Sequence, residues 1–193
     1  MRTRGVLPFG CRRRRSRLGF SCGSPVTSEE PDEHESLSVE KTKKEIPGAR
    51  KSSRARVLFV CIGNACRSPM AEAIARYDAA DVIEPHSAGL SPLGHIADLT
   101  KQILLRNGYS VEGLSSDPLT PEACDAADFI INMTGTPRAE SFWEQEKVED
   151  WMVQDPYGAD ADTYQRVFEG IQRRVNQLAH ELREKREHKT SSG

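Results

Sequence analysis

Cysteines and long apolar runs are both scarce in this chain of 193 residues. No apolar run approaches the roughly 18 residues that a membrane span needs, so we expect no membrane-spanning segment. Five cysteines are too few for a disulfide scaffold, which argues against a small secreted disulfide-rich protein. Hydrophobic residues make up only 37% of the chain. That share is low for a chain that is globular throughout.

Charge is distributed unevenly along the chain. Residues 1–55 contain 13 Lys and Arg against 7 Asp and Glu, whereas residues 56–193 contain 14 against 22. The formal net charge of -2 therefore hides a basic N-terminal segment and an acidic remainder. Because the phosphate backbone of nucleic acids requires a basic protein face, we expect no specific nucleic-acid binding by the acidic part.

The N-terminal segment, residues 1–55, shows no apolar periodicity and contains the run Arg12–Arg15. Such a segment cannot bury enough surface to offset its ordering entropy, so we predict a disordered tail. Its first 28 residues hold seven arginines and no acidic residue, the composition of an organelle transit peptide. The alternative is that the start site is assigned too early. We expect a cytoplasmic protein, with organelle targeting by this tail as the alternative.

Strand patterns alternate with helix patterns from Arg56 onward. An α/β fold follows from this alternation, with a doubly wound, four-stranded parallel sheet and helices on both faces. We expect the domain to span residues 56–186 and residues 187–193 to form a disordered C-terminus. The predicted strands cover 57–60, 82–89, 128–132 and 148–153, and the predicted helices cover 70–77, 97–107, a short segment from 120, 137–146 and 162 to about 185.

Residues 61–69, Cys-Ile-Gly-Asn-Ala-Cys-Arg-Ser-Pro, connect the first predicted strand to a helix. Ligands of α/β sheets bind at the carboxyl ends of the strands, and a helix N-terminus favours anions such as phosphate. Gly63 lets the backbone curl at low steric cost. Arg67 can hold two phosphate oxygens with its planar guanidinium, which a lysine cannot do. The segment therefore predicts a phosphate-binding loop.

Cys61, at the start of this loop, lies in the same positive field, which favours the thiolate form of a cysteine. Ser68 can donate a hydrogen bond to that thiolate. One alternative is a buried strand-end cysteine beside an exposed arginine. Another is a metal pair formed by Cys61 and Cys66. Zinc sites usually have four ligands with shorter pair spacing, and no second Cys or His pair follows, so we expect neither a metal nor a cofactor.

Asp155 is the candidate acid. Cleavage of a phosphate ester requires a proton donor for the leaving oxygen and a base for the hydrolytic water. Asp155-Pro156 follows the last predicted strand in a glycine-bearing loop, which places the carboxyl group near the carboxyl edge of the sheet. The alternative is a simple turn, because Asp-Pro is common in turns.

Residues 60–73, from Val60 to Ala73, resemble the signature of the low-molecular-weight protein tyrosine phosphatase family. The similarity continues at Ser-Ala-Gly (87–89), Ala-Asp (127–128) and Asp-Pro-Tyr-Gly (155–158), and it covers residues 56–183. The resemblance implies a metal-independent phosphatase that removes phosphate from phosphotyrosine in proteins through a cysteinyl-phosphate. It also implies a phosphoprotein substrate as partner, and we expect a monomer.

The resemblance also implies a role for each matching residue. Cys61 would attack phosphorus, Arg67 and the loop amides would bind the phosphoryl oxygens, and Asp155 would protonate the leaving group and then activate water. Asn64 and Ser87 would hold the loop shape. The residues expected to contact substrate are Ile62, Gly63, Asn64, Ala65, Cys66, Ser68 and Tyr157, of which Tyr157 either forms one wall of an aryl slot or packs ordinarily.

Cys66 suggests redox control, because it can trap an oxidised Cys61 as a disulfide. A thioredoxin-type reductant is therefore an expected partner for reactivation. Two positions depart from the family. Leu114 stands where many members carry a histidine. Ala65 lacks both the bulky aliphatic side chain typical of the tyrosine phosphatases and the threonine typical of the related arginine phosphatases.

Three other functions stay open. The first is a protein arginine phosphatase of the same family. The second is a thioredoxin-coupled arsenate reductase, whose disulfide relay needs two further cysteines, expected at 133–139 where this chain has none. The third is a non-catalytic phosphate-binding module, which the joint presence of Cys61, Arg67 and Asp155 argues against.

Deletion of residues 1–54 tests the tail assignment. We expect aryl phosphatase activity and melting temperature to stay nearly unchanged, because the segment has no core-forming pattern. Steady-state kinetics and thermal unfolding of the shortened and full chains measure both quantities. A large drop in either would show that the segment packs on the domain.

Overall fold

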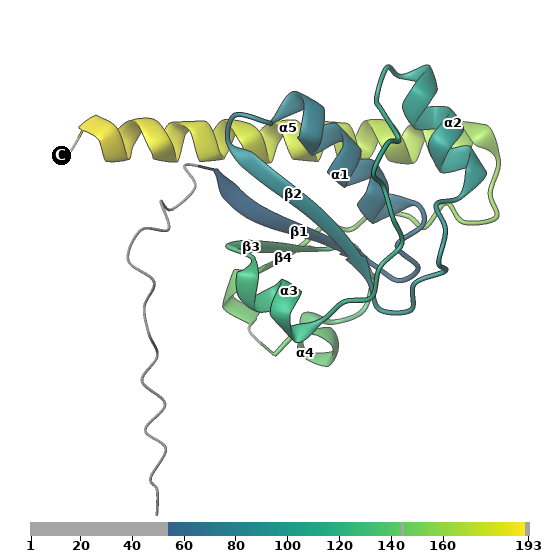
Figure 1. The fold of residues 1–193 in the computed structure, drawn as a ribbon, viewed down its shortest axis with the longest axis horizontal. Helices are drawn as coiled ribbons and strands as arrows, with labels where there is room; N and C mark the ends of the chain where they lie inside the picture. Colours follow the sequence, from purple (N-terminus) through teal and green to yellow (C-terminus); the bar gives the residue numbers. More distant parts are fainter. Residues whose placement is uncertain (1–53, 144, 192–193) are drawn as a thin grey trace, which may run out of the picture. The chain divides into compact units, whose positions relative to one another are not determined.

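A computed structural model describes residues 54–143 and 145–191. All of the predicted N-terminal tail except residues 54 and 55 lies outside them, and Ala55 is the first residue of a strand. Four parallel strands form one sheet in the order β2-β1-β3-β4 (Figure 1). The predicted fold class is therefore confirmed. The strands are β1 (Ala55–Cys61), β2 (Ile83–Gly89), β3 (Phe129–Asn132) and β4 (Val148–Asp150).

Helices cover both faces of this sheet (Figure 1). Helices α1 and α5 pack against each other on one face, and α3 and α4 lie on the other. Thr120 caps the N-terminus of α3: its Oγ1 accepts a hydrogen bond from the N–H of Ala123, and Pro121 occupies the first helical position. The helices are α1 (Arg67–Asp78), α2 (Asp98–Arg106), α3 (Pro121–Ala126), α4 (Arg138–Ser141) and α5 (Ala161–Ser191).

The core has two layers because successive side chains of a strand point to opposite faces. Val57 and Phe59 of β1 pack in the larger cluster with Ile171 of α5. Leu58 and Val60 pack in the smaller cluster on the other face. Burial on both faces explains why this strand is a continuous apolar run, as expected for a parallel sheet.

Three predicted boundaries were wrong. The helix predicted at 137–146 ends at Ser141, because the extended Phe142 buries its ring in the smaller cluster, and a short 3₁₀ turn follows at Gln145–Lys147. Strand β4 ends at Asp150 rather than at Val153. Helix α5 continues to Ser191, so residues 187–191 are helical rather than disordered. The run of Arg, Glu and Lys at 183–187 favours this extension.

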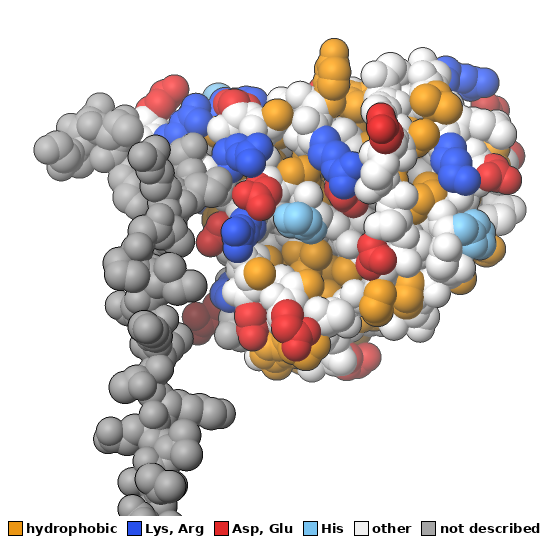
Figure 2. Space-filling view, in the orientation of Figure 1, with side chains coloured by type: hydrophobic (Ala, Val, Ile, Leu, Met, Phe, Trp, Pro, Cys, Tyr) orange, Lys and Arg blue, Asp and Glu red, His pale blue; other side chains and the backbone are white. Residues whose placement is uncertain are grey.

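The α3 face of the sheet is incompletely covered beside β2. Figure 2 shows hydrophobic side chains in a hollow on this face, with charged side chains of both signs around it. A groove of about 420 Å³ lies there, lined by Leu58, Ala88 and Ala123 among others. Within residues 54–143 and 145–191, no helix is long and apolar enough to cross a membrane.

Candidate active site

A pocket of about 220 Å³ lies at the carboxyl end of β1. Because α1 carries the chain from β1 to β2 while β3 flanks β1 on the other side, this end is the topological switch point where α/β folds bind ligands. The pocket is lined by Cys61, Ile62, Gly63, Ala65, Cys66, Arg67, Ser91, Leu93, Asp155 and Tyr157. Of the predicted site residues, only Asn64, Ser68 and Ser87 are outside this lining.

The surrounding protein holds the carbonyl groups of the loop. Those of Cys61, Ile62, Gly63 and Ala65 accept hydrogen bonds of 2.8–3.1 Å from the backbone N–H groups of Leu90, Ser91, Leu93 and Ala97. The C=O and N–H groups of a trans peptide point in opposite directions. The N–H groups that follow these carbonyls therefore point away from residues 90–97. Sequence reasoning missed this segment, because backbone-to-backbone contacts leave no residue signature.

Asn64 connects the loop to three other segments. Its φ of 43° is in the left-handed region, which asparagine tolerates better than most residues. Its side-chain oxygen accepts the N–H of Asp117 at 2.7 Å. Its amide nitrogen donates to the hydroxyl oxygens of Ser68 and Ser87, each at 2.9 Å. The buried Asn64 side chain thus holds the loop from behind the pocket.

Glu72 extends this network and was not among the predicted site residues. Ser87 Oγ donates to Glu72 Oε2 at 2.5 Å, and Arg76 donates to the other carboxylate oxygen. Arg76 also donates to the carbonyls of Glu112 and Gly113. Glu72 is buried within the apolar run Met-Ala-Glu-Ala-Ile, and an acid on a buried helix face was the signal that could have identified it.

Leu114 packs against the core beside this network. Arg76 supplies the positive charge beside Glu72 in this chain.

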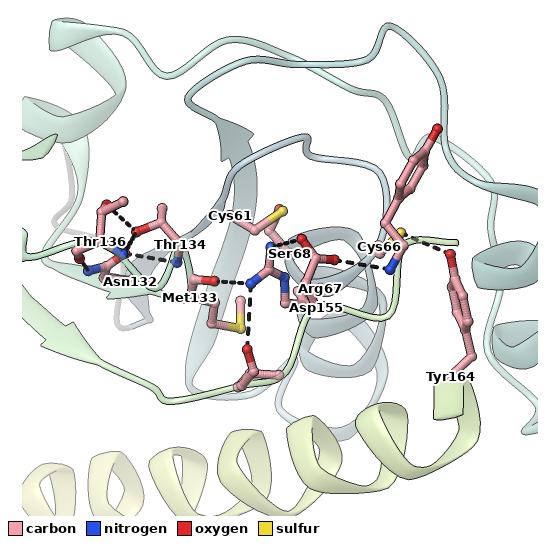
Figure 3. Close-up of polar contacts among 12 residues, drawn as sticks. Cys61, Cys66, Arg67, Ser68, Asn132, Met133, Thr134, Thr136, Asp155 and Tyr164 are labelled. Atoms are coloured by element: carbon pink, nitrogen blue, oxygen red, sulfur yellow. Dashed lines mark hydrogen bonds and ion pairs between the residues drawn. The ribbon is translucent and has the colours of Figure 1, made fainter. Parts of the chain in front are cut away.

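Cys61 has a defined hydrogen-bond partner. Its sulfur is 3.0 Å from Ser68 Oγ (Figure 3). Ser68 Oγ accepts a hydrogen bond from Asn64, so its own proton is free for the sulfur or for the carbonyl of Ala88 at 3.4 Å. The shorter distance favours donation to the sulfur. A donated hydrogen bond together with the N-terminus of α1 stabilises a thiolate.

Arg67 is only 3% exposed, and one of its three guanidinium nitrogen atoms has no hydrogen-bond partner among the described residues. Its Nη1 donates to the carbonyl of Met133 at 2.7 Å, and its Nη2 is 2.5 Å from Asp155 Oδ2 (Figure 3). Its Nε is buried without a hydrogen-bond partner among the described residues. A buried N–H group without an acceptor costs about 1–3 kcal/mol, so this donor favours an incoming oxygen.

Two residues anchor the backbone that orients Arg67. The side-chain oxygen of Asn132 accepts hydrogen bonds from the N–H and the hydroxyl of Thr134, at 3.0 and 2.7 Å (Figure 3). Both residues are buried, and Met133 lies between them. The Met133 carbonyl is a backbone group, so the sequence contained no signal for its contact with Arg67.

Both carboxylate oxygens of Asp155 have hydrogen-bond partners in the structure. Asp155 Oδ1 accepts the N–H of Tyr157 at 3.1 Å, while Oδ2 pairs with Arg67. Tyr157 is 59% exposed, and together with Ile62 and Leu93 it gives the pocket an apolar rim. The rim suits an aromatic or other partly apolar group attached to a phosphate.

Cys66 is buried, and its sulfur is 3.3 Å from the hydroxyl of Tyr164 (Figure 3). Burial raises the pKa of the Cys66 thiol, although hydrogen bonds with Tyr164 and Thr100 partly oppose this rise. Cys124 is in the other core layer with Leu58 and Val60. Among the residues that the structure describes, no group of three or more His, Cys, Asp or Glu is placed to hold a metal ion.

The fold is an α/β fold with a four-stranded parallel sheet, and the pocket at the carboxyl end of β1 is lined by a cysteine at the end of that strand and an arginine at the start of α1. Residues 56–188 match the family model for low molecular weight phosphotyrosine protein phosphatase, and the chain belongs to this family.

Curated relatives in the family carry three different activities. A protein-arginine-phosphatase of Bacillus subtilis is 33% identical and covers 67% of this chain and 98% of its own length. A probable low molecular weight protein-tyrosine-phosphatase of Ralstonia nicotianae is 31% identical, with coverages of 62% and 90%. A glutaredoxin arsenate reductase of Synechocystis is 30% identical, with coverages of 64% and 95%.

A solved structure shows the same fold. The arginine phosphatase from Geobacillus stearothermophilus superimposes with a TM-score of 0.64 and 27% identity, covering 69% of this chain and 96% of that chain.

Substitution of Gly89 tests how tightly the loop is enclosed. A Cβ atom there would lie 2.8 Å from both Asn64 Cβ and the Ile62 carbonyl oxygen. Relief of that overlap must displace the loop, so we expect Gly89→Ala to lower kcat/KM for an aryl phosphate by roughly tenfold or more. The control is Gly108→Ala, at a positive φ in open space, which should lower the melting temperature and leave kcat/KM unchanged. Wild-type kinetics for Gly89→Ala would contradict this geometry.

Proposed function

We propose that this protein hydrolyses phosphotyrosine in proteins through a cysteinyl-phosphate intermediate. The observation that carries the proposal is the state of Arg67: its guanidinium lines the pocket that contains Cys61, and its buried Nε has no acceptor. A phosphoryl oxygen would supply that acceptor. The planar guanidinium and the loop N–H groups are together the donors that a dianionic phosphate requires.

In the first step the phosphoryl group binds Arg67 and the loop, competing with Asp155 for the guanidinium. Its binding frees the Asp155 carboxyl group to face the leaving oxygen. The Cys61 sulfur then forms a bond to phosphorus while the phosphorus–oxygen ester bond breaks. The proton of the Asp155 carboxyl group moves to the departing oxygen.

In the second step Asp155, now a carboxylate, accepts a proton from water. The water oxygen attacks phosphorus and the sulfur–phosphorus bond breaks, which releases phosphate and returns Cys61 as a thiolate. The hydroxyl of Ser68, 3.0 Å from the sulfur, supports the thiolate as nucleophile and as leaving group. The N-terminus of α1 acts in the same direction.

The apolar rim favours an aryl phosphate. Ile62, Leu93 and Tyr157 are each at least 41% exposed, so their side chains can contact a tyrosine ring at the pocket entrance. Tyr157 can stack on that ring.

An arginine phosphatase is the second candidate, and its support is the similarity to the Bacillus and Geobacillus proteins. Ala65 lines the pocket with a single methyl group, which leaves room for either leaving group.

Arsenate reduction has less support in this chain. A disulfide relay passes oxidation from the nucleophile to further thiols that can reach it. Cys66 lines the same pocket as Cys61, but Cys124, the third cysteine that the structure describes, lies in the opposite core layer. The segment 133–139, where relay cysteines were expected, contains none.

Two substitutions test the proposed chemistry. Cys61→Ser should abolish turnover while phosphate still binds, because a hydroxyl is a far poorer nucleophile than a thiolate.

Asp155→Asn should slow hydrolysis of tyrosyl phosphate by about 10²–10⁴-fold, with a smaller loss for substrates whose leaving group is already acidic. Rates across a series of aryl phosphates measure this difference. Equal losses for all leaving groups would identify another acid.

Residue 65 tests the substrate class. With phosphotyrosine and phosphoarginine peptides of otherwise identical sequence, we expect wild type to prefer phosphotyrosine and to show measurable activity on phosphoarginine. Ala65→Ile should improve phosphotyrosine binding by roughly tenfold, since burial of about two of the three added carbons against the ring contributes about 0.8 kcal/mol each. Ala65→Thr should shift the preference toward phosphoarginine. A wild-type protein that hydrolyses phosphoarginine much faster would refute the phosphotyrosine assignment and leave the Cys61 mechanism standing.

A further inference from the structure

A second groove, of about 550 Å³, lies between α5 and the segment Met152–Gln154. Its α5 wall comes from positions one, two or three helical turns apart, so the residues share one helix face. They are Arg166, Val167, Gly170, Arg173, Arg174 and Gln177. The groove is separate from the active-site pocket, yet both border the same segment: Gln154 lines the groove and Asp155 lines the pocket.

The groove is positively charged on a domain with an excess of acidic residues. Its lining, within residues 54–143 and 145–191, includes three arginines and no carboxylate. Arg174 has a structural role, because it donates to the carbonyl of Met152 at 3.3 Å and lies 5.9 Å from the centre of the Trp151 ring. Arg166 contacts the hydroxyl of Thr163. Within the described residues, neither Arg166 nor Arg173 has a carboxylate oxygen within 4.0 Å. Hydrogen bonds with Thr163, and to a smaller extent the charge of Arg166, lower the pKa of the exposed Asp160 carboxyl group. Both guanidinium groups therefore have donors for an anionic ligand.

Gly170 is a second feature of the groove, beside its positive charge, that suits a bound ligand. A Cβ atom there would meet only Arg173 Nη2, at 4.0 Å, so internal packing would accept alanine. Glycine in the middle of a helix destabilises the helix relative to alanine. Its effect here is to leave the helix surface bare between Arg166 and Arg173. A ligand backbone can therefore approach α5 closely between the two charges.

We propose that this groove binds an extended acidic segment of a phosphoprotein substrate, at a distance from the phosphorylated residue. The proposal rests on the proposed function for its choice of partner. Arg166 and Arg173 are seven residues apart, about 10 Å along a helix that rises 1.5 Å per residue. A peptide in the extended polyproline II conformation advances about 3.1 Å per residue with three residues per turn, so its side chains at i and i+3 lie on the same side, about 9 Å apart. The chemistry that fits is a polyproline II peptide with Glu or Asp at positions i and i+3.

Binding of unphosphorylated peptides tests the groove independently of catalysis. The probes are a fluorescent, otherwise neutral peptide with two glutamates three residues apart and the same peptide with glutamines. Fluorescence anisotropy should show wild type binding the glutamate peptide at least tenfold more tightly, with affinity falling as salt rises. The double variant Arg166→Gln/Arg173→Gln should lose this preference. Gly170→Leu should also lose it, because it fills the groove without changing charge.

The matched control is Lys101→Gln/Arg106→Gln on α2, which removes the same charge outside the groove and should bind like wild type. Equal binding of the glutamate peptide to wild type and to Arg166→Gln/Arg173→Gln would overturn the proposal. Loss of binding in the Lys101→Gln/Arg106→Gln control would also overturn it, since the attraction would then be general. A third result would also overturn the proposal. If inorganic phosphate displaces the glutamate peptide, and the glutamate peptide inhibits aryl phosphate turnover, then the peptide binds in the catalytic pocket and not in the groove.

Kinetics with phosphotyrosine peptides separates this inference from the proposed function. The glutamate pair attached to the phosphopeptide should lower KM about tenfold in wild type and leave kcat unchanged. Arg166→Gln/Arg173→Gln should raise KM for this peptide alone and leave turnover of a small aryl phosphate unchanged. A wild type without phosphatase activity would refute the proposed function, while the anisotropy result would still decide whether the groove binds acidic peptides. An unchanged KM would overturn its role in substrate binding.

Discussion

The backbone conformation of Asn64 is the constraint on which the site depends. A residue in the left-handed region turns the chain sharply enough for the loop to close in front of α1, and asparagine carries a modest strain there. Its side chain offsets that strain with hydrogen bonds to Ser68, Ser87 and the backbone of Asp117. These contacts also set the position of Ser68 Oγ, 3.0 Å from the Cys61 sulfur. One residue thus links the shape of the loop to the environment of the proposed nucleophile.

The loop is held from outside, so its geometry does not depend on a ligand. Residues 90–97 take up its carbonyl groups, and Gly89 allows the chain to pass so close that a methyl group would not fit. Glu72 and Arg76 support Ser87 from the helix behind. A buried network of this kind is favourable only when every member has a partner. Preformed donors require little reorganisation when a phosphoryl group binds, which favours catalysis.

Arg67 divides its donors between the fold and the site. Its contact with the Met133 carbonyl orients the guanidinium, its pair with Asp155 holds the proposed acid nearby, and its Nε is unused. In the proposed mechanism a phosphoryl group takes over part of this set and releases Asp155 for proton transfer. The segment Met152–Asp155 would then serve both proposals, because it ends at the acid and borders the arginine groove on α5.

Local signals in the sequence predicted the sheet, most helices and the grouping of Cys61, Arg67 and Asp155 around one pocket. Such features depend on neighbouring residues, so a single chain displays them. The break after Ser141 followed from burial of Phe142 against the sheet, which no helix propensity reveals. Glu72, the Met133 carbonyl and the segment 90–97 enter the site through contacts between distant parts of the chain. The sequence by itself determined which reactive groups the pocket contains. Only the tertiary structure decided which donors stay free and how the loop is held, because hydrogen-bond pairing depends on distances that folding sets.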